Sequence, residues 1–155
     1  MAACKKEKCV KRKEEPIGKR IGQTESPEKF YSLHPSWRFS SCDPEKWTFK
    51  KENIEKWFWD EILTWFSNME KQFWSEVLVR DNKKNHYIDV SSLNKCAQKR
   101  LQELKIEQEA VVSLRLTGKH RFYGIINEGV FCIIWFDDDH GDNDTCVCRS
   151  KKKGS

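Results

Sequence analysis

Residues 111–136 read VVSLRLTGKHRFYGIINEGVFCIIWF, and this stretch decides the fold. It holds three apolar runs, separated by two three-residue loops that each contain a glycine. Loops this short join neighbouring strands that run in opposite directions. The stretch therefore predicts an antiparallel β-meander with strands at 111–116, 120–126 and 130–136.

Upstream of the meander, apolar residues recur every three or four positions, which is the spacing of a helix with one buried face. This pattern predicts helices over roughly 54–66, 67–77 and 93–104, with a short strand at 86–90. Helices followed by a meander define an α+β fold. We expect the N-terminal helices to pack on one face of a small C-terminal antiparallel sheet.

Charge and composition divide the chain into three parts. Residues 1–30 lack hydrophobic periodicity and predict a flexible basic arm, residues 31–150 a single α+β domain, and residues 151–155 a basic tail. The formal net charge of the whole chain is +5, yet the segment 31–148 holds 16 Lys/Arg against 19 Asp/Glu. The positive charge therefore resides in the two ends.

Basic ends of this kind suit a nucleic acid, because each cation placed near a phosphate releases counterions. Solubilising tails are the alternative. The candidate nucleic-acid contacts in these ends are Lys11, Arg12, Arg149, Lys151 and Lys152.

The longest unbroken apolar run is Val130–Phe136, whereas a membrane-spanning helix needs about 20 residues. The N-terminal lysines are not followed by an apolar stretch, so no secretory signal is predicted. We therefore expect a cytoplasmic protein without a membrane partner. Its seven cysteines are then expected to be thiols or metal ligands rather than disulfides.

Hairpin register assigns side chains to the two faces of the meander. Leu114 opposite Phe122 belongs to an apolar face, which we expect to be buried. By alternation, the other face is expected to be open and to hold Arg115 opposite Arg121, beside Tyr123 and Trp135. Opposed arginines repel unless an anion lies between them. A bound phosphate would supply that anion, with the aromatic rings as a stacking surface, and a salt bridge to Asp137 is the alternative.

The same strands carry the residue types that cleave RNA without a metal. Such cleavage needs a proton acceptor, a proton donor and cations that stabilise the crowded phosphate. A plain RNA-binding surface would use similar residues, and His120 has a purely structural role as its alternative. The candidate catalytic residues are Arg121, Arg115, Tyr123, Lys119, His140 and His120.

Metal chemistry has two weaker candidates. The acidic run from Asp137 to Asp144 offers hard oxygen ligands, although it does not match a calcium loop and a solvated turn is the alternative. Cys146 and Cys148, together with His140, lack the spacing of a zinc knuckle. No Walker loop, dinucleotide fingerprint or nucleophile elbow is present, so we expect no cofactor and assign no metal ligand.

The segments 114–124 and 129–140 resemble small bacterial and mobile-element proteins related to the RelE/ParE-like toxin superfamily. The segments 85–89 and 97–101 add to this likeness, which covers about residues 68–150. The resemblance implies helices packed on a small antiparallel sheet. It also implies a small antitoxin partner and, for ribosome-dependent members, metal-free cleavage of messenger RNA.

Carried over to this chain, the resemblance implies that Arg115, Arg121 and Tyr123 bind the phosphate, while Lys119 or His140 handles protons. Other members of the superfamily act on gyrase. The leading expectation is therefore an RNA-cleaving toxin. The alternatives are a binding module for nucleic acid or protein and a metal-dependent nuclease that uses the acidic run.

Overall fold

The computed structural model describes residues 29–49, 58–138 and 147–148. They form a five-stranded sheet with helices, which confirms the predicted α+β class. The sheet has the order β1-β5-β4-β3-β2. It is mixed, because β1 runs parallel to β5 while the other neighbours are antiparallel. The strands are β1 (Ser36–Arg38), β2 (His86–Asp89), β3 (Ala110–Arg115), β4 (Arg121–Asn127) and β5 (Val130–Asp137).

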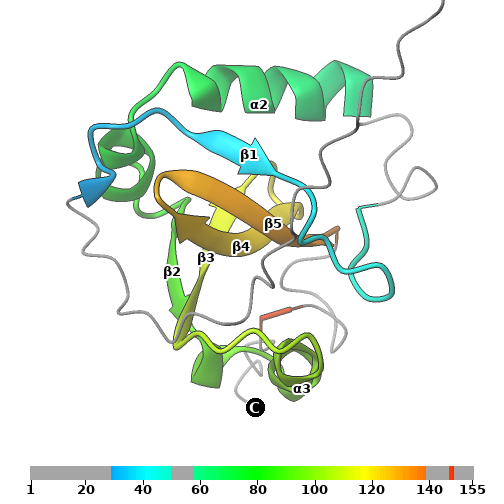
Figure 1. The fold of residues 1–155 in the computed structure, drawn as a ribbon. Coiled ribbons are helices and arrows are strands. Elements are labelled where there is room, and N and C mark those ends of the chain that lie inside the picture. The colour runs from blue at the N-terminus through cyan, green and yellow to red at the C-terminus, as the bar shows by residue number, and fades with distance from the viewer. Residues whose placement is uncertain (1–28, 50–57, 139–146, 149–155) are drawn as a thin grey trace, which may run out of the picture.

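Two α-helices lie on opposite sides of this sheet, α2 (Leu63–Glu70) and α3 (Lys95–Glu103) (Figure 1). Three shorter helical segments complete the described fold: η2 (Phe58–Ile62), η3 (Glu76–Arg80) and η4 (Val90–Ser92). The break between the first two predicted helices falls later than expected. The capping-box pattern of Ser67 and Glu70 predicts the break at Ser67, but α2 continues through both residues. The Glu76 carboxylate accepts a hydrogen bond from the Phe73 backbone N–H (2.8 Å), so the cap forms at Phe73.

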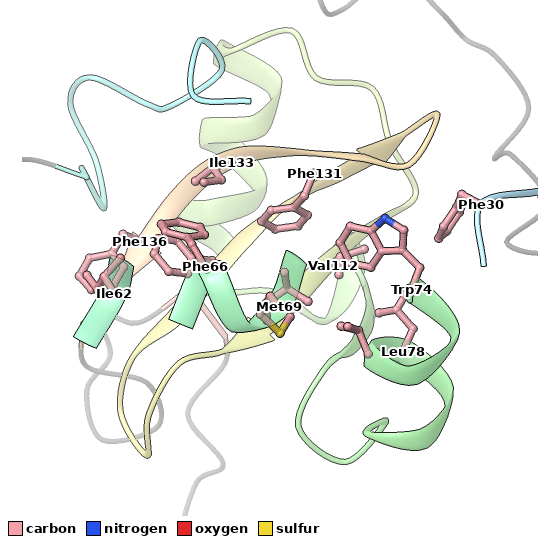
Figure 2. Close-up of a cluster of buried hydrophobic side chains, with 13 residues drawn as sticks. Phe30, Ile62, Phe66, Met69, Trp74, Leu78, Val112, Phe131, Ile133 and Phe136 are labelled. Atoms are coloured by element: carbon pink, nitrogen blue, oxygen red, sulfur yellow. The ribbon is translucent and has the colours of Figure 1, made fainter. Parts of the chain in front are cut away.

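One core fills the space between the sheet and α2 with η3 (Figure 2). Phe66 on α2 packs against Phe122 on β4 with ring centroids 5.3 Å apart. Trp74 is fully buried and donates its indole N–H to the Gly129 carbonyl (2.8 Å), which ties the helical layer to the β4–β5 turn. Burying each such side chain contributes about 1.5–3 kcal/mol, so this aromatic layer holds the helices on the sheet.

A second core fills the opposite face, where α3 packs. Val111, Tyr123 and Trp135 have no exposed surface and lie in one cluster with Ala97 and Leu101 of α3. The prediction of an open face is therefore wrong. The reason is that both sets of alternating residues are apolar, and a sheet with two apolar faces must be covered on both.

The predicted register is correct for one hairpin and wrong for the other. Arg115 pairs with Arg121 between β3 and β4, as expected. Between β4 and β5 the turn has two residues, because Glu128 and Gly129 both adopt positive φ angles of 51° and 81°. A bulge next to Gly124 then realigns the strands so that Arg121 pairs with Asp137.

Gly124 is required at this bulge. A Cβ at this position would lie 2.2 Å from the Cys132 carbonyl oxygen. The close backbone approach explains why Ile134 and Trp135 both enter the second core, whereas Ile133 enters the first. Strict alternation along the sequence could not predict that shift.

Candidate functional site

The fold gathers four of the predicted site residues at one end of the sheet. Here β3 ends at Arg115, a loop carries Lys119 and His120, and β4 begins at Arg121. We call residues 115–121 the hairpin end. β5 finishes beside it at Asp137, which is the first residue of the acidic run in the sequence.

Arg115 has a fixed backbone and an exposed side chain. Its N–H donates to the Asn85 side-chain oxygen (2.9 Å), and its carbonyl accepts from the Trp65 indole N–H (3.1 Å). These two contacts anchor the end of β3 from both sides. The Arg115 Nε donates to the Thr117 carbonyl (3.4 Å), which Arg121 also binds, while the side chain as a whole remains exposed. An exposed guanidinium at an anchored strand end suits the capture of an anion.

Arg121 is a buried cation that carbonyl groups hold in place. Its guanidinium donates to the backbone oxygens of Thr117 and His120, the latter at 2.9 Å, and the residue is 8% exposed. Among residues 29–49, 58–138 and 147–148, no carboxylate forms an ion pair with it. Burial lowers the pKa of Arg121, and the neighbouring charge of Arg115 lowers it further. An anion bound beside Arg121 would offset the cost of its burial and its repulsion from Arg115.

His120 lies between Thr117 and Phe136. Its Nδ1 shares a hydrogen bond with the Thr117 hydroxyl, and its ring stacks on Phe136 with centroids 5.8 Å apart. The side chain is half-buried, and burial lowers its pKa from the ordinary value of 6.5. The imidazole is therefore neutral at neutral pH and has the protonation state that a proton acceptor needs.

Tyr123 and Trp135 do not reach the surface. The Tyr123 hydroxyl lies 3.0 Å from the Cys148 sulfur, and burial raises the pKa of this phenol far above its usual range. Trp135 packs edge-to-face on Trp47 with ring centroids 5.0 Å apart. Both side chains are fully buried, so the prediction that they form an exposed stacking surface is wrong.

Sequence reasoning missed a buried ion pair on this face. Asp43 accepts two hydrogen bonds from Arg100, at 2.7 and 2.8 Å, and one from the Trp135 indole N–H at 3.0 Å. Burial raises the pKa of the Asp43 carboxyl, but the hydrogen bonds from Arg100, Glu45 and Trp135 outweigh burial and hold it below the ordinary value. Asp43 and Arg100 lie 57 residues apart in sequence, so no local sequence pattern predicts the pair.

An acidic groove runs along the α2 side of the hairpin end. Asp60 and Glu61 contribute carboxylates to it, and Trp65 contributes an aromatic wall. Its remaining lining residues are Thr64, Asn68, Leu116 and Thr117. The groove gives the hairpin end one acidic flank, which would repel a polyanion approaching from that side.

Several predicted site residues lie outside the described residues: His140, Arg149, Lys151, Lys152, Lys11 and Arg12. The same holds for most of the acidic run, for residues 1–28 of the predicted arm and for the 151–155 tail. Within the described ranges, no group of three or more His, Cys, Asp or Glu side chains could hold a metal ion. The described cysteines, Cys42, Cys96, Cys132 and Cys148, form no disulfide.

Comparison with known proteins yields no match to a protein-family model, a curated protein or a solved structure. No helix in the described part of the chain has the length and apolar character needed to cross a membrane. The residues of the hairpin end therefore provide the evidence for a function.

Proposed function

We propose that this chain is an RNA-directed, toxin-like endoribonuclease that acts at the hairpin end without a metal. The observation behind the proposal is the cross-strand pair of Arg115 and Arg121. Two guanidinium groups at directly opposed positions repel each other, and an RNA phosphate between them would turn that repulsion into attraction. The resemblance of this stretch to the RelE/ParE-like toxins supports the same proposal.

The two arginines would have different roles toward the phosphate. Exposed Arg115 would capture the phosphate from solvent, while buried Arg121 would supply a charge in surroundings of low dielectric, where it acts more strongly. Carbonyl contacts from Thr117 and His120 already fix the Arg121 guanidinium. No reorganisation is then needed when negative charge builds up on the phosphate.

The cleavage step uses the RNA's own 2′-hydroxyl as the nucleophile. His120 takes the proton from this hydroxyl, whose oxygen attacks the adjacent phosphorus. The bond from phosphorus to the 5′-oxygen breaks, and Lys119 donates a proton to that leaving oxygen. The products are a 2′,3′-cyclic phosphate and a 5′-hydroxyl end. Tyr123 and Trp135 have no part in this scheme, because neither side chain reaches the surface.

A binding module without catalysis is the second candidate, and one observation favours it. The sequence predicts Tyr123 as a third phosphate-binding and catalytic residue, but its hydroxyl is buried against Cys148. Cations with few proton-transfer groups beside them bind RNA without cutting it. The experiment must therefore separate binding from cleavage.

Purified protein should be incubated with labelled single-stranded RNA in the presence of a chelator, and the product ends should be analysed. We expect cleavage to 2′,3′-cyclic phosphate ends. The rate should fall at least about 100-fold in Arg115→Ala or His120→Gln, since each removes a charge-stabilising or proton-transfer group. Lys99→Ala is the matched control, because Lys99 is an exposed cation on α3.

Each other outcome has a definite meaning. Binding that depends on Arg115 without any product would favour the binding module. Cleavage that stops on chelation would contradict the metal-free mechanism. Equal activity in Arg115→Ala and Lys99→Ala would show that the hairpin end is not the site.

A further inference from the structure

We infer that the bound RNA strand leaves the hairpin end over the loop Asp81–Asn85, where Lys83 and Lys84 contact its next phosphates. This inference rests on the proposed function and extends it by naming the path of the strand. It assigns a binding role to two lysines that lie far from the hairpin end in sequence.

The loop is anchored directly to the end of β3. Asn85 is 5% exposed, and its amide binds in two directions: the oxygen accepts from the Arg115 N–H (2.9 Å), and the nitrogen donates to the Val77 carbonyl (3.2 Å). His86 pairs with Ser113, so Lys84 precedes the first paired residue of β2 by two positions, and Arg115 follows Ser113 by two. The backbone of Lys84 is fixed in turn by its N–H bond to the Asp81 carbonyl (2.9 Å).

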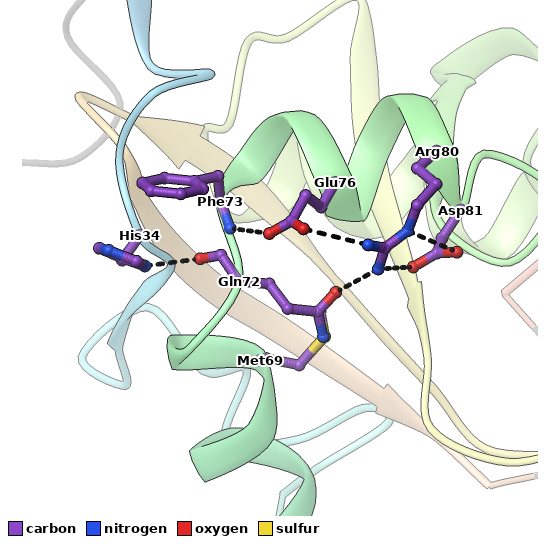
Figure 3. Close-up of polar contacts among 7 residues, drawn as sticks. All are labelled: His34, Met69, Gln72, Phe73, Glu76, Arg80 and Asp81. Atoms are coloured by element: carbon purple, nitrogen blue, oxygen red, sulfur yellow. Dashed lines mark hydrogen bonds and ion pairs between the residues drawn. The ribbon is translucent and has the colours of Figure 1, made fainter.

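The cations in and next to this loop differ in whether a carboxylate pairs with them. Arg80 is engaged by Glu76 at 3.0 Å and by Asp81 at 3.1 Å, and it also donates to Gln72 (Figure 3). Arg80 thus shares its charge between two carboxylates, Glu76 and Asp81. Within the described ranges no carboxylate pairs with Lys83 or Lys84, and both side chains are exposed. The loop whose Asn85 binds the Arg115 backbone therefore carries two cations that have no carboxylate partner among the described residues.

The direction of the strand follows from the opposite flank. On the α2 side, the groove beside Leu116 and Thr117 is lined by Asp60 and Glu61. A phosphate backbone entering that groove would meet two carboxylates, whereas over the Asp81–Asn85 loop it meets two lysines. A strand bound at Arg115 is therefore guided away from α2 and toward β2.

The test is the salt dependence of binding to a labelled single-stranded RNA of roughly 12 nucleotides. Each phosphate contact on single strands contributes about 0.7 to the slope of log affinity against log salt concentration. The double variant Lys83→Ala/Lys84→Ala should therefore bind about tenfold more weakly and lose about 1.4 from that slope. The charge-matched control is Lys95→Ala/Lys99→Ala on α3, which should retain the wild-type slope.

The outcomes separate this inference from the function on which it rests. If Arg115→Ala weakens binding while the Lys83/Lys84 variant matches its control, the path is wrong and the site at the hairpin end stands. If wild-type protein does not bind RNA at all, both proposals fail. Because the two lysine side chains are exposed, thermal unfolding of the variant should match that of the wild type, which excludes a folding defect as the cause.

Discussion

Among the described residues, two arginines are buried, Arg100 and Arg121, and they have different partners. Arg100 meets Asp43 through two parallel hydrogen bonds and also contacts Glu45 and Glu103. Arg121 meets backbone carbonyls, with Arg115 as its cross-strand neighbour on β3 and Asp137 on β5. Both residues are less than one-tenth exposed. The difference therefore lies in their partners and not in their burial.

The contrast indicates which arginine serves the fold and which serves a ligand. A forked Arg–Asp pair satisfies both charges, and because Asp43 also binds Trp135, the pair connects α3, the 43–49 segment and β5. Arg121 forms no ion pair with a described carboxylate, although Asp137 is its cross-strand partner on β5 and favours its charge. Burial of this kind is costly for folding, and a bound anion offsets the cost.

The largest effect should come from removing the carboxylate of the compensated pair. Asp43→Ala leaves the Arg100 charge and the Trp135 N–H without their acceptor, and we expect a loss of about 3–5 kcal/mol in the free energy of unfolding. Denaturant-induced unfolding would measure this loss. A loss below about 1 kcal/mol would mean that the pair does not hold the second core together.

Low pH should destabilise the protein through the same Asp43–Arg100 pair. The pKa of Asp43 in the folded protein lies below its ordinary value of 3.8. Its contribution to stability is therefore complete above that value and is lost as the pH falls through the folded pKa. Unfolding measured against pH should show a steep acid limb that becomes shallower in Asp43→Asn. An unchanged limb in that variant would assign acid unfolding to other carboxylates.

Substitution of Arg121 should have the opposite effect, with little change in stability and a large loss of RNA cleavage. Arg121→Gln keeps a neutral amide donor at this position and removes the repulsion from Arg115. We expect its unfolding free energy to change by less than about 1 kcal/mol, while RNA cleavage is lost. A variant that is strongly destabilised would place Arg121 with Arg100 as a structural residue and would remove the contrast.

The smallest expected change is the pH dependence that comes from the titration of His120. Its pKa is lowered from 6.5 by burial, so the neutral form dominates at neutral pH. Cleavage should rise with pH through a value below 6.5 and then level off, because the proton acceptor must be neutral. The stability change from this group has the same sign, since the unfolded chain binds the proton more readily. A cleavage rate that falls over this pH range would assign proton acceptance to another group.

The sequence predicted the parts of the fold that depend on local pattern. Apolar alternation and short glycine loops located β3, β4 and β5, and the β3–β4 register followed from them, including Arg115 opposite Arg121. The helical spacing located α3. These features depend on residues close together in the chain, where the period of the side chains is decisive.

What the sequence could not predict depends on distant contacts. The bulge next to Gly124 moves Trp135 relative to its neighbours, and α3 covers a face that looked open. The pairing of Asp43 with Arg100 spans 57 residues. Tyr123 was therefore assigned to a surface site although it lies in a core, whereas Arg115 was placed correctly because the end of the strand is exposed.

The most direct test of the proposed site is expression of the wild type beside Arg115→Ala in a bacterial host, with growth and total RNA integrity followed together. Arg115 is suited to this test because its backbone is anchored through Asn85 and Trp65 while its side chain is exposed. The account predicts growth arrest with RNA cleavage by the wild type, and neither effect in the variant. Intact RNA in both cultures, or equal cleavage in both, would contradict it.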